Sequence, residues 1–192
     1  MLESEYQKRR RLPRALQQPS PPPADFRYTI RAAATEDLPA VLALYRHYVR
    51  NSVVTFDEKP PTLRAFRSKF EHAEKLGYPF LVAISPNGDL LGYARAQPFR
   101  DKSAYRHTVE STIYLGPAAT GRGLGRALLE QLIERSREAG IKEMIAIISD
   151  SGADASIGLH RALGFRETGR MGKVGYKFER WIGIVMMQKS LR

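Results

Sequence analysis

The residues that could do chemistry are concentrated between positions 108 and 129. One acid, Glu110, stands in a β-rich apolar run, Thr108–Leu115. An acid inside an apolar strand must be solvated, paired or functional. Its carboxylate could accept a proton from an ammonium group as a general base. The alternative is a structural acid that pairs with an arginine such as Arg95.

A glycine-rich loop and an apolar-periodic helix follow this strand. The loop alternates glycines with larger residues, in the order Gly121, Arg122, Gly123, Leu124, Gly125 and Arg126. A glycine turn that leads into a helix N-terminus is suited to hold an anion, because its backbone N–H groups and the helix dipole face the ligand. Two arginines add positive charge. The alternative is a turn that only caps the helix.

Two common phosphate-binding motifs do not fit this loop. A P-loop requires Gly-Lys-Ser/Thr, and no lysine follows these glycines. A dinucleotide-binding Gly-x-Gly-x-x-Gly requires glycine where Arg126 or Leu128 stands, depending on the register. NTPase and Rossmann-type chemistry are therefore excluded. The remaining interpretation is a pyrophosphate held by the backbone N–H groups of the turn and the helix N-terminus.

Composition sets the broad class. The 192 residues are 43% hydrophobic and 27% charged, as in a globular domain with a filled core. The net charge of +11 suits either nucleic-acid binding or an enzyme with a polyanionic cofactor. The chain has no cysteine, which excludes disulfides and thiol nucleophiles, and its four histidines form no visible metal-ligand cluster. We expect a cytoplasmic location.

The first 25 residues differ from the rest of the chain. They carry a basic run, KRRR, and then a Pro/Gln/Ser-rich stretch. This composition buries too little apolar surface to offset the entropy of ordering, so it predicts a flexible arm over 1–25 and a folded domain over 26–192. No apolar run follows the basic residues, and none elsewhere is long enough to span a bilayer, so we expect neither a secretory signal nor a membrane partner.

The patterns of the domain predict a mixed α/β fold with the order β-α-α-β-β-β-α-β-α-β-β. The first helix is expected to begin at an N-cap, Thr35, and the second at Thr62. A PNGD turn predicts a hairpin between two strands. The expected strands are 26–32, 79–85, 90–97, 108–115, 143–149, one from about 165 to 170, and 181–188, and the expected helices are 35–49, 63–76, 124–140 and 155–163.

Four segments, TVESTIY, GRGLGRALL, ASIGLHRALGF and GYKFERW, resemble the GNAT acyltransferase superfamily, and within it the phosphinothricin and methionine sulfone/sulfoximine N-acetyltransferase branch. The resemblance extends over about residues 28–191. It implies the GNAT fold, in which two central strands splay apart around the arm of acetyl-CoA. It also implies a homodimer, with aromatic or apolar residues near the second helix and the C-terminal strands at its interface.

The resemblance assigns the cofactor-binding residues. The backbone of Ile113, Tyr114 and Leu115 would pair with the pantetheine arm, as an added strand does. The loop Gly121, Arg122, Gly123, Leu124, Gly125 and Arg126 would hold the pyrophosphate. Ser156 would contact the amide arm. Relatives usually have asparagine where Ala153 stands, so a pantetheine hydrogen bond is expected to be missing or moved to Asp154.

The resemblance also implies that Glu110 is the general base that deprotonates the acceptor amine. His160 occupies a place where much of the superfamily has a tyrosine that protonates the departing thiolate. It could donate that proton, help to order the base, or be an ordinary helix histidine. A second departure is Gly183, where relatives often have an acid.

For the acceptor, Arg100 and Arg106 could bind a carboxylate, because a guanidinium fork matches a carboxylate. Tyr105 lies between them, and Phe56 matches an aromatic pocket wall. The predicted activity is direct transfer of acetyl to the α-amino group of a small amino acid or analogue, without a metal. Two alternatives are another amine, such as a protein N-terminus, polyamine or aminoglycoside, and a basic nucleic-acid-binding protein; dispersed basic residues do not favour the latter.

Overall fold

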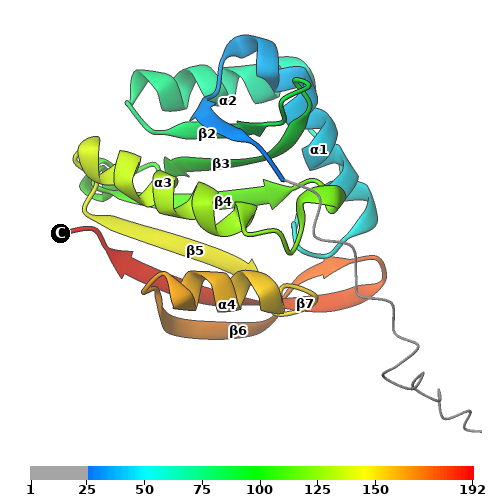
Figure 1. Ribbon diagram of the computed structural model, residues 1–192. Coiled ribbons are helices and arrows are strands. Elements are labelled where there is room, and N and C mark those ends of the chain that lie inside the picture. The colour runs from blue at the N-terminus through cyan, green and yellow to red at the C-terminus, as the bar shows by residue number, and fades with distance from the viewer. Residues whose placement is uncertain (1–25) are drawn as a thin grey trace, which may run out of the picture.

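The computed structural model describes residues 26–192, in which a seven-stranded mixed sheet carries helices on both faces (Figure 1). The strands are β1 (Thr29–Ala32), β2 (Phe80–Ile84), β3 (Leu90–Pro98), β4 (Thr108–Leu115), β5 (Glu143–Ser149), β6 (Arg166–Lys177) and β7 (Arg180–Ser190), and the α-helices are α1 (Leu38–Asn51), α2 (Leu63–Lys75), α3 (Leu124–Glu138) and α4 (Asp154–Ala162). Their order confirms the predicted one. The arm predicted over 1–25 lies outside the described residues, so the boundary at residue 26 stays a prediction.

The sheet has the strand order β1-β2-β3-β4-β5-β7-β6. All neighbouring strands pair antiparallel except β4 and β5, which pair parallel. That parallel pairing covers only Thr108–Glu110 against Glu143–Ile145. Beyond Glu110, β4 continues against β3 alone and β5 against β7 alone. The sheet is therefore split in its middle from Glu110 onward, as the resemblance implied.

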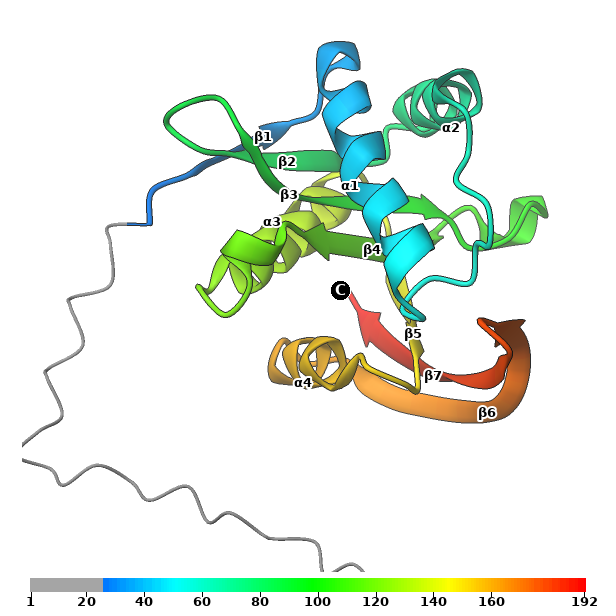
Figure 2. The ribbon, with the colours of Figure 1, turned by 90° about the vertical axis from the view of Figure 1, so that its right-hand side faces the viewer.

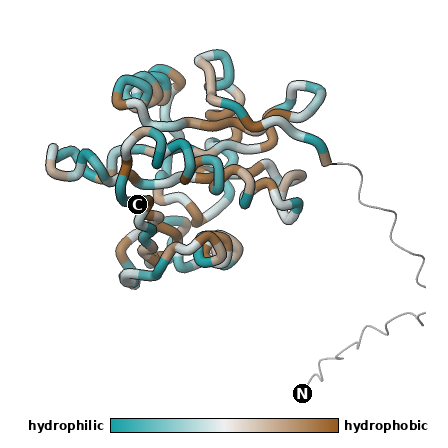
Figure 3. The backbone as a smooth tube through the Cα atoms, turned by 60° about the vertical axis from the view of Figure 1, so that its left-hand side comes forward, coloured by the Kyte–Doolittle hydropathy of each residue, from teal (hydrophilic) through white to brown (hydrophobic). Residues whose placement is uncertain are grey.

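Alternation along β2 and β3 divides the core between the two faces, because successive strand residues point to opposite sides. Phe80, Val82 and Tyr93 pack with α1 and α2. The residues between them, among them Leu81 and Ala94, pack with α3. In Figure 2, α1 and α2 lie on one side of the sheet and α3 and α4 on the other. Figure 3 shows the corresponding hydrophobic stretches along the strands.

The start of α1 differs from the prediction. Thr35 does not cap this helix, and residues Thr35–Asp37 instead form a 3₁₀ turn. The Asp37 carboxylate accepts the backbone N–H of Ala34 at 2.8 Å and pairs with Arg31 at 2.7 Å. The α-helix then begins at Leu38, with proline in its first turn, where a missing N–H costs no hydrogen bond. The predicted cap at Thr62 is confirmed, since its hydroxyl accepts the N–H of Ala65 at 3.2 Å.

The two C-terminal strands are longer than predicted. β6 was expected to end near Arg170, but it runs to Lys177 and pairs with β7 over most of its length. Register shifts at Glu167/Gly169 and Met171/Gly175 interrupt its alternation. Bulges and glycines erase the period-2 pattern, so the strand is not visible as one element in the sequence.

Candidate active site

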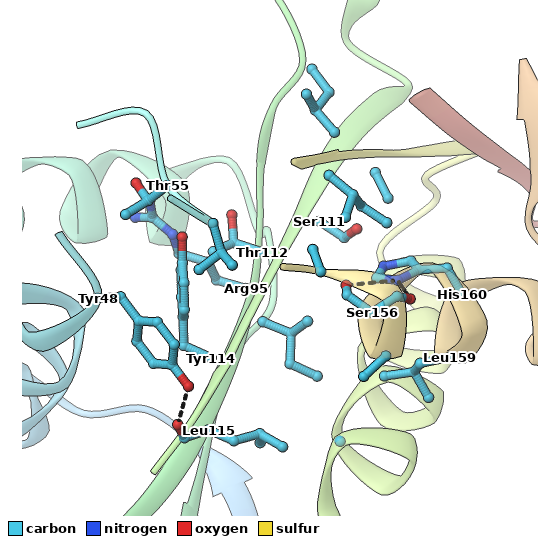
Figure 4. A pocket seen from close by; sticks show the side chains of 18 of the residues that line it. Tyr48, Thr55, Arg95, Ser111, Thr112, Tyr114, Leu115, Ser156, Leu159 and His160 are labelled. Atoms are coloured by element: carbon cyan, nitrogen blue, oxygen red, sulfur yellow. Dashed lines mark hydrogen bonds between the residues drawn. The ribbon is translucent and has the colours of Figure 1, made fainter. Parts of the chain in front are cut away.

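A cavity of about 650 Å³ opens where β4 and β5 diverge. β4 lines one wall with Glu110–Leu115, and β5 lines the other with Ala146–Ile148. The loop between α1 and α2, the turn before α3, and α4 close the remaining sides. Figure 4 shows these walls, with β4 passing between the tyrosines on one side and α4 on the other. The cavity thus joins the two halves of the split sheet.

Glu110 lies in this cavity at the residue where the parallel pairing ends. Burial raises the pKa of its carboxyl group, because a low-dielectric surrounding disfavours the charged form. The positive charges of Arg100 and Arg95 and a hydrogen bond with Gln97 oppose this shift in pKa. A carboxylate with a raised pKa is a better proton acceptor than one in water, and it remains ionisable here because two guanidinium groups are near.

Beyond Glu110, the edge of β4 that faces β5 has no partner strand among the described residues. Ile113, Tyr114 and Leu115 lie along this edge and line the cavity. The Tyr48 hydroxyl donates to the carbonyl of Leu115 at 2.6 Å, which fixes the end of the strand against α1. An extended chain could therefore hydrogen-bond to β4 as an added strand does.

The glycine loop, exposed at Gly121 and Gly123, leads into the N-terminus of α3. Gly121 and Gly123 have φ of 74° and 81°, a left-handed conformation that glycine adopts without strain. Gly123 caps α3 without any side-chain hydrogen bond, so the N–H groups of the first turn stay available to an anion. Gly125 and Arg126 also line the cavity.

Two residues of the predicted pyrophosphate loop do not line the cavity with their side chains. Leu124 is fully buried in the core, so only its backbone could meet a ligand. The guanidinium of Arg122 stacks over the ring of Phe26, 4.4 Å from its centroid. Arg126 pairs with Glu130 at 2.9 Å, and both side chains are about half exposed. Cofactor contacts by these three side chains stay predictions.

On the opposite wall, α4 places Ser156 and His160 in the cavity. His160 is only 2% exposed, and its Nδ1 lies 2.8 Å from the Ser156 carbonyl oxygen. Because a carbonyl can only accept, Nδ1 carries the hydrogen. Burial lowers the pKa of His160, so its ring is neutral and Nε2 is a hydrogen-bond acceptor. Nε2 is buried and has no hydrogen-bond partner within the described residues 26–192, so it could accept a hydrogen bond from a ligand.

The loop between α1 and α2 closes one side of the cavity. Thr55 and Asp57 of this loop are linked to Tyr45, whose hydroxyl donates to the Asp57 carboxylate at 2.6 Å. Lys177 of β6, 2% exposed, donates to the Thr55 carbonyl at 2.8 Å and so ties the loop to the C-terminal hairpin. Phe56 lines the cavity and packs directly over Gly175, where any side chain would collide with its ring. Its role as a wall of the acceptor pocket stays a prediction.

The other predicted acceptor residues lie outside this cavity wall. Arg100, Tyr105 and Arg106 are exposed on the loop between β3 and β4. Arg100 stacks on Phe99, 4.2 Å from the ring centroid, and its charge still acts on Glu110. Their roles in binding stay predictions.

Several lining residues were not identified from the sequence as site residues. They are Tyr45, Tyr48, Thr55, Asp57, Arg95 and Gln97. Among them, Arg95 was considered only as a partner for Glu110. The alternation of a strand could have identified two of them, because it places Arg95 and Gln97 on one face of β3. In the structure, Gln97 lies directly opposite Glu110 on β4.

The two residues that depart from the family pattern, Ala153 and Gly183, lie in different surroundings. Ala153 lines the cavity at the N-terminus of α4, whereas Asp154 is exposed and does not line it. Gly183 donates its N–H to the Asp150 carboxylate at 2.9 Å, and a Cβ at this position would collide with that carboxylate. Asp150 thus supplies an acid at the place where an acid at position 183 would stand.

Within residues 26–192, no group of three or more His, Asp or Glu side chains is placed to hold a metal ion. In the same range, no helix is long and apolar enough to cross a membrane.

Comparison with known proteins gives consistent matches. The model of the acetyltransferase (GNAT) family matches residues 41–165. A phosphinothricin N-acetyltransferase of Alcaligenes faecalis is 44% identical over 85% of this chain and 82% of that protein. An L-methionine sulfoximine/L-methionine sulfone acetyltransferase of Pseudomonas paraeruginosa is 43% identical over 85% of this chain and 94% of its own. The crystal structure of a GNAT superfamily phosphinothricin acetyltransferase from Sinorhizobium meliloti in complex with AcCoA superimposes with a TM-score of 0.81, at 42% identity, over 85% of this chain and 88% of that chain.

Proposed function

The chain belongs to the acetyltransferase (GNAT) family and is an acetyl-CoA-dependent N-acetyltransferase, and we propose that it acetylates the α-amino group of a small amino acid or analogue. Relatives named for phosphinothricin and for methionine sulfone and sulfoximine support this acceptor class. The observation that carries the proposal is the position of Glu110, in the cavity and at the point where the central strands separate.

Three features of the chain fit acetyl-CoA. The open N–H groups at the start of α3 suit a pyrophosphate, and the unpartnered edge of β4 suits an amide-bearing arm. His160 lines the same cavity from α4, and its Nε2 has no hydrogen-bond partner among residues 26–192. Bound acetyl-CoA supplies the thioester that the acceptor attacks. Ala153 offers no side-chain hydrogen bond, so Ser156 is the polar group that we assign to the cofactor arm.

We assign the general base to Glu110. An amino acid arrives as an ammonium zwitterion, and its nitrogen can attack only after it loses a proton. Glu110 accepts that proton, directly or through one water, and the nitrogen then bonds to the acetyl carbon as the carbon–sulfur bond breaks. Holding the amine next to the acyl carbon supplies much of the rate, because the reactants no longer need to find each other.

His160 has a narrower role in this proposal. Its Nδ1–H is engaged by Ser156 and its Nε2 is unprotonated, so in this state it has no proton to donate to a leaving thiolate. We assign it to accepting a hydrogen bond from the cofactor or from a water that the base uses. The free thiolate takes its proton from solvent or from the acceptor nitrogen.

For the acceptor, Phe56 forms the apolar wall and Arg100 and Arg106 hold the α-carboxylate near the mouth, beside Tyr105. A polyamine or aminoglycoside would meet the positive charges of Arg95 and Arg100 near Glu110, which disfavour a polycation. A protein N-terminus lacks the free carboxylate that these arginines would bind. These alternatives and nucleic-acid binding are tested by the same acceptor panel and a gel-shift control.

The decisive experiment measures free-thiol release from acetyl-CoA with a panel of amines. The panel contains phosphinothricin, methionine sulfone, methionine sulfoximine, common amino acids, spermidine, an aminoglycoside and an N-terminal peptide. We expect saturable turnover with the amino acids. Mass spectrometry of the products should place the acetyl group on the α-nitrogen. Turnover with the peptide or the polycations alone would overturn the acceptor assignment while leaving the family intact.

We also propose that the protein is a homodimer through its C-terminal hairpin. Large apolar side chains are exposed there, including Tyr176 at 55%, Phe178 at 52% and Trp181 at 59%. Monomers rarely expose such a group of aromatic residues on one element, so a partner surface is the physical explanation that we favour. A cytoplasmic location remains a prediction of the sequence.

A further inference from the structure

Arg95 is a half-buried cation that lines the cavity. The proposed reaction has not yet given it a ligand. It lies on β3 opposite Thr112, two residues from Gln97, which is opposite Glu110. Residues 95, 97, 110 and 112 therefore point to one face of the sheet. Both Arg95 and Glu110 line the cavity, and the charge of Arg95 acts on Glu110. Arg95 is thus part of the surface that meets the acceptor.

The surroundings of Arg95 hold its guanidinium without neutralising it. Its central carbon lies 5.5 Å from the ring centroid of Phe66 and 6.0 Å from that of Phe80. Its Nε is buried and has no hydrogen-bond partner in the part of the chain that the structure describes. Among residues 26–192, no carboxylate forms an ion pair with it. In Figure 4 its side chain extends toward Thr55 and Tyr114 on the wall opposite His160.

The unsatisfied Nε of Arg95 has a chemical consequence. A buried N–H without an acceptor is costly, whereas a bound anion would satisfy this donor. The aromatic rings fix the side chain beforehand, so little conformational entropy is lost when an anion binds. The geometry therefore favours an oxyanion as the ligand of Arg95.

The position of Arg100 indicates which anion Arg95 would bind. Arg100 follows β3 beyond Pro98, so along the strand it lies on the other side of Gln97 and Glu110 from Arg95. The α-carboxylate and the side-chain terminus of an amino acid lie on different sides of its amine, so two cations on opposite sides of Glu110 can each bind one of them. With the α-carboxylate at Arg100, as the proposed function has it, Arg95 faces the far end of the acceptor. The step from Arg95 to Gln97 is about 7 Å of strand, the length scale of a short amino-acid side chain.

We propose that Arg95 binds a distal oxyanion of the acceptor, such as a phosphinate or a side-chain carboxylate, and so selects anionic amino acids over neutral ones of the same shape. This inference rests on the proposed function, since it requires an amino-acid acceptor. A charge-assisted hydrogen bond is about twice as strong as a neutral one. A neutral sulfone can accept from Arg95, but it gains less.

Phosphinothricin and methionine sulfone form a matched pair for the test. Each carries a methyl group and two oxygens on a tetrahedral atom at the end of the same two-carbon chain, but only the phosphinate is charged. In Arg95→Gln we expect KM for phosphinothricin to rise by about tenfold or more and KM for methionine sulfone by less than about threefold. Both are measured on the high-pH plateau of the rate, because loss of the Arg95 charge also raises the pKa of Glu110. Arg95→Lys keeps the charge and should restore part of the loss.

The controls separate this inference from a structural role and from the proposed function. Arg100→Gln should raise KM for both acceptors alike, because both have an α-carboxylate. Acetyl-CoA affinity and thermal unfolding of each variant show whether the fold and the cofactor site are intact. Equal losses for both acceptors in Arg95→Gln, or no loss for either, would overturn the role of Arg95. A wild-type enzyme that acetylates neither acceptor would instead overturn the proposed function.

Discussion

Replacing Glu110 with glutamine is the most direct test of the chemistry. The change keeps the size and hydrogen-bonding shape of the side chain but removes its ability to take a proton. Positioned general bases contribute about 10²- to 10⁴-fold in rate. At about 1.36 kcal/mol for each factor of ten, this corresponds to about 3 to 5 kcal/mol of the barrier. We therefore expect Glu110→Gln to lose about 10²- to 10⁴-fold in kcat.

The pH dependence gives this prediction a second, independent readout. Burial raises the pKa of Glu110, and the carboxylate is the active form, so the wild-type rate falls as the pH decreases through that raised pKa. Glu110→Gln has no such group and should lose this limb of the profile. Arg100→Gln removes a charge that lowers the pKa, so the limb should move to higher pH. The assay is thiol release across a pH series at saturating substrates.

Stability should change in the opposite direction from activity. A folded pKa above the unfolded value means that the native state holds the proton more tightly. The free energy of unfolding that Glu110 contributes therefore decreases as the pH rises from the ordinary pKa to the raised one. At neutral pH, Glu110→Gln should unfold at the same temperature as the wild type or higher, and calorimetry should show unchanged acetyl-CoA affinity. Unchanged turnover at every pH would refute the base role.

Three further predictions follow from local geometry. Gly123→Val forces a β-branched residue into a left-handed turn at φ 81°, so we expect acetyl-CoA to bind about tenfold more weakly by calorimetry; unchanged affinity would contradict pyrophosphate binding at this turn. Gly183→Ala places a methyl group against the Asp150 carboxylate and should lower the free energy of unfolding by about 1–3 kcal/mol in chemical denaturation, whereas Gly172→Ala, with open space, should have little effect. Trp181→Glu puts a charge on the exposed apolar hairpin and should shift the protein from dimer to monomer in light scattering; a wild type that is already monomeric would disprove the proposed interface.

Much of the fold could be predicted because local patterns were strong. The limits of β4 and β5 follow directly from short apolar β-rich runs, and both match the structure. Thr62 was identifiable as a cap because its hydroxyl acts within one helical turn. Thr35 was misassigned because Asp37, two residues later, supplies the competing oxygen. The end of β6 was missed because glycines and bulges remove the alternation that marks a strand.

The sequence by itself determined the ingredients of the site: an acid in a β-rich run, a glycine turn before a helix, and a resemblance that named the cofactor. Each of these features is encoded in neighbouring residues. Only the tertiary structure decided where the parallel pairing stops, at Glu110, because the separation of β4 from β5 depends on partners more than thirty residues apart. It also decided that Arg95 lines the cavity with an Nε that has no partner among residues 26–192, and that Nε2 of His160 is a hydrogen-bond acceptor. Burial and register create these properties, and no local pattern carries them.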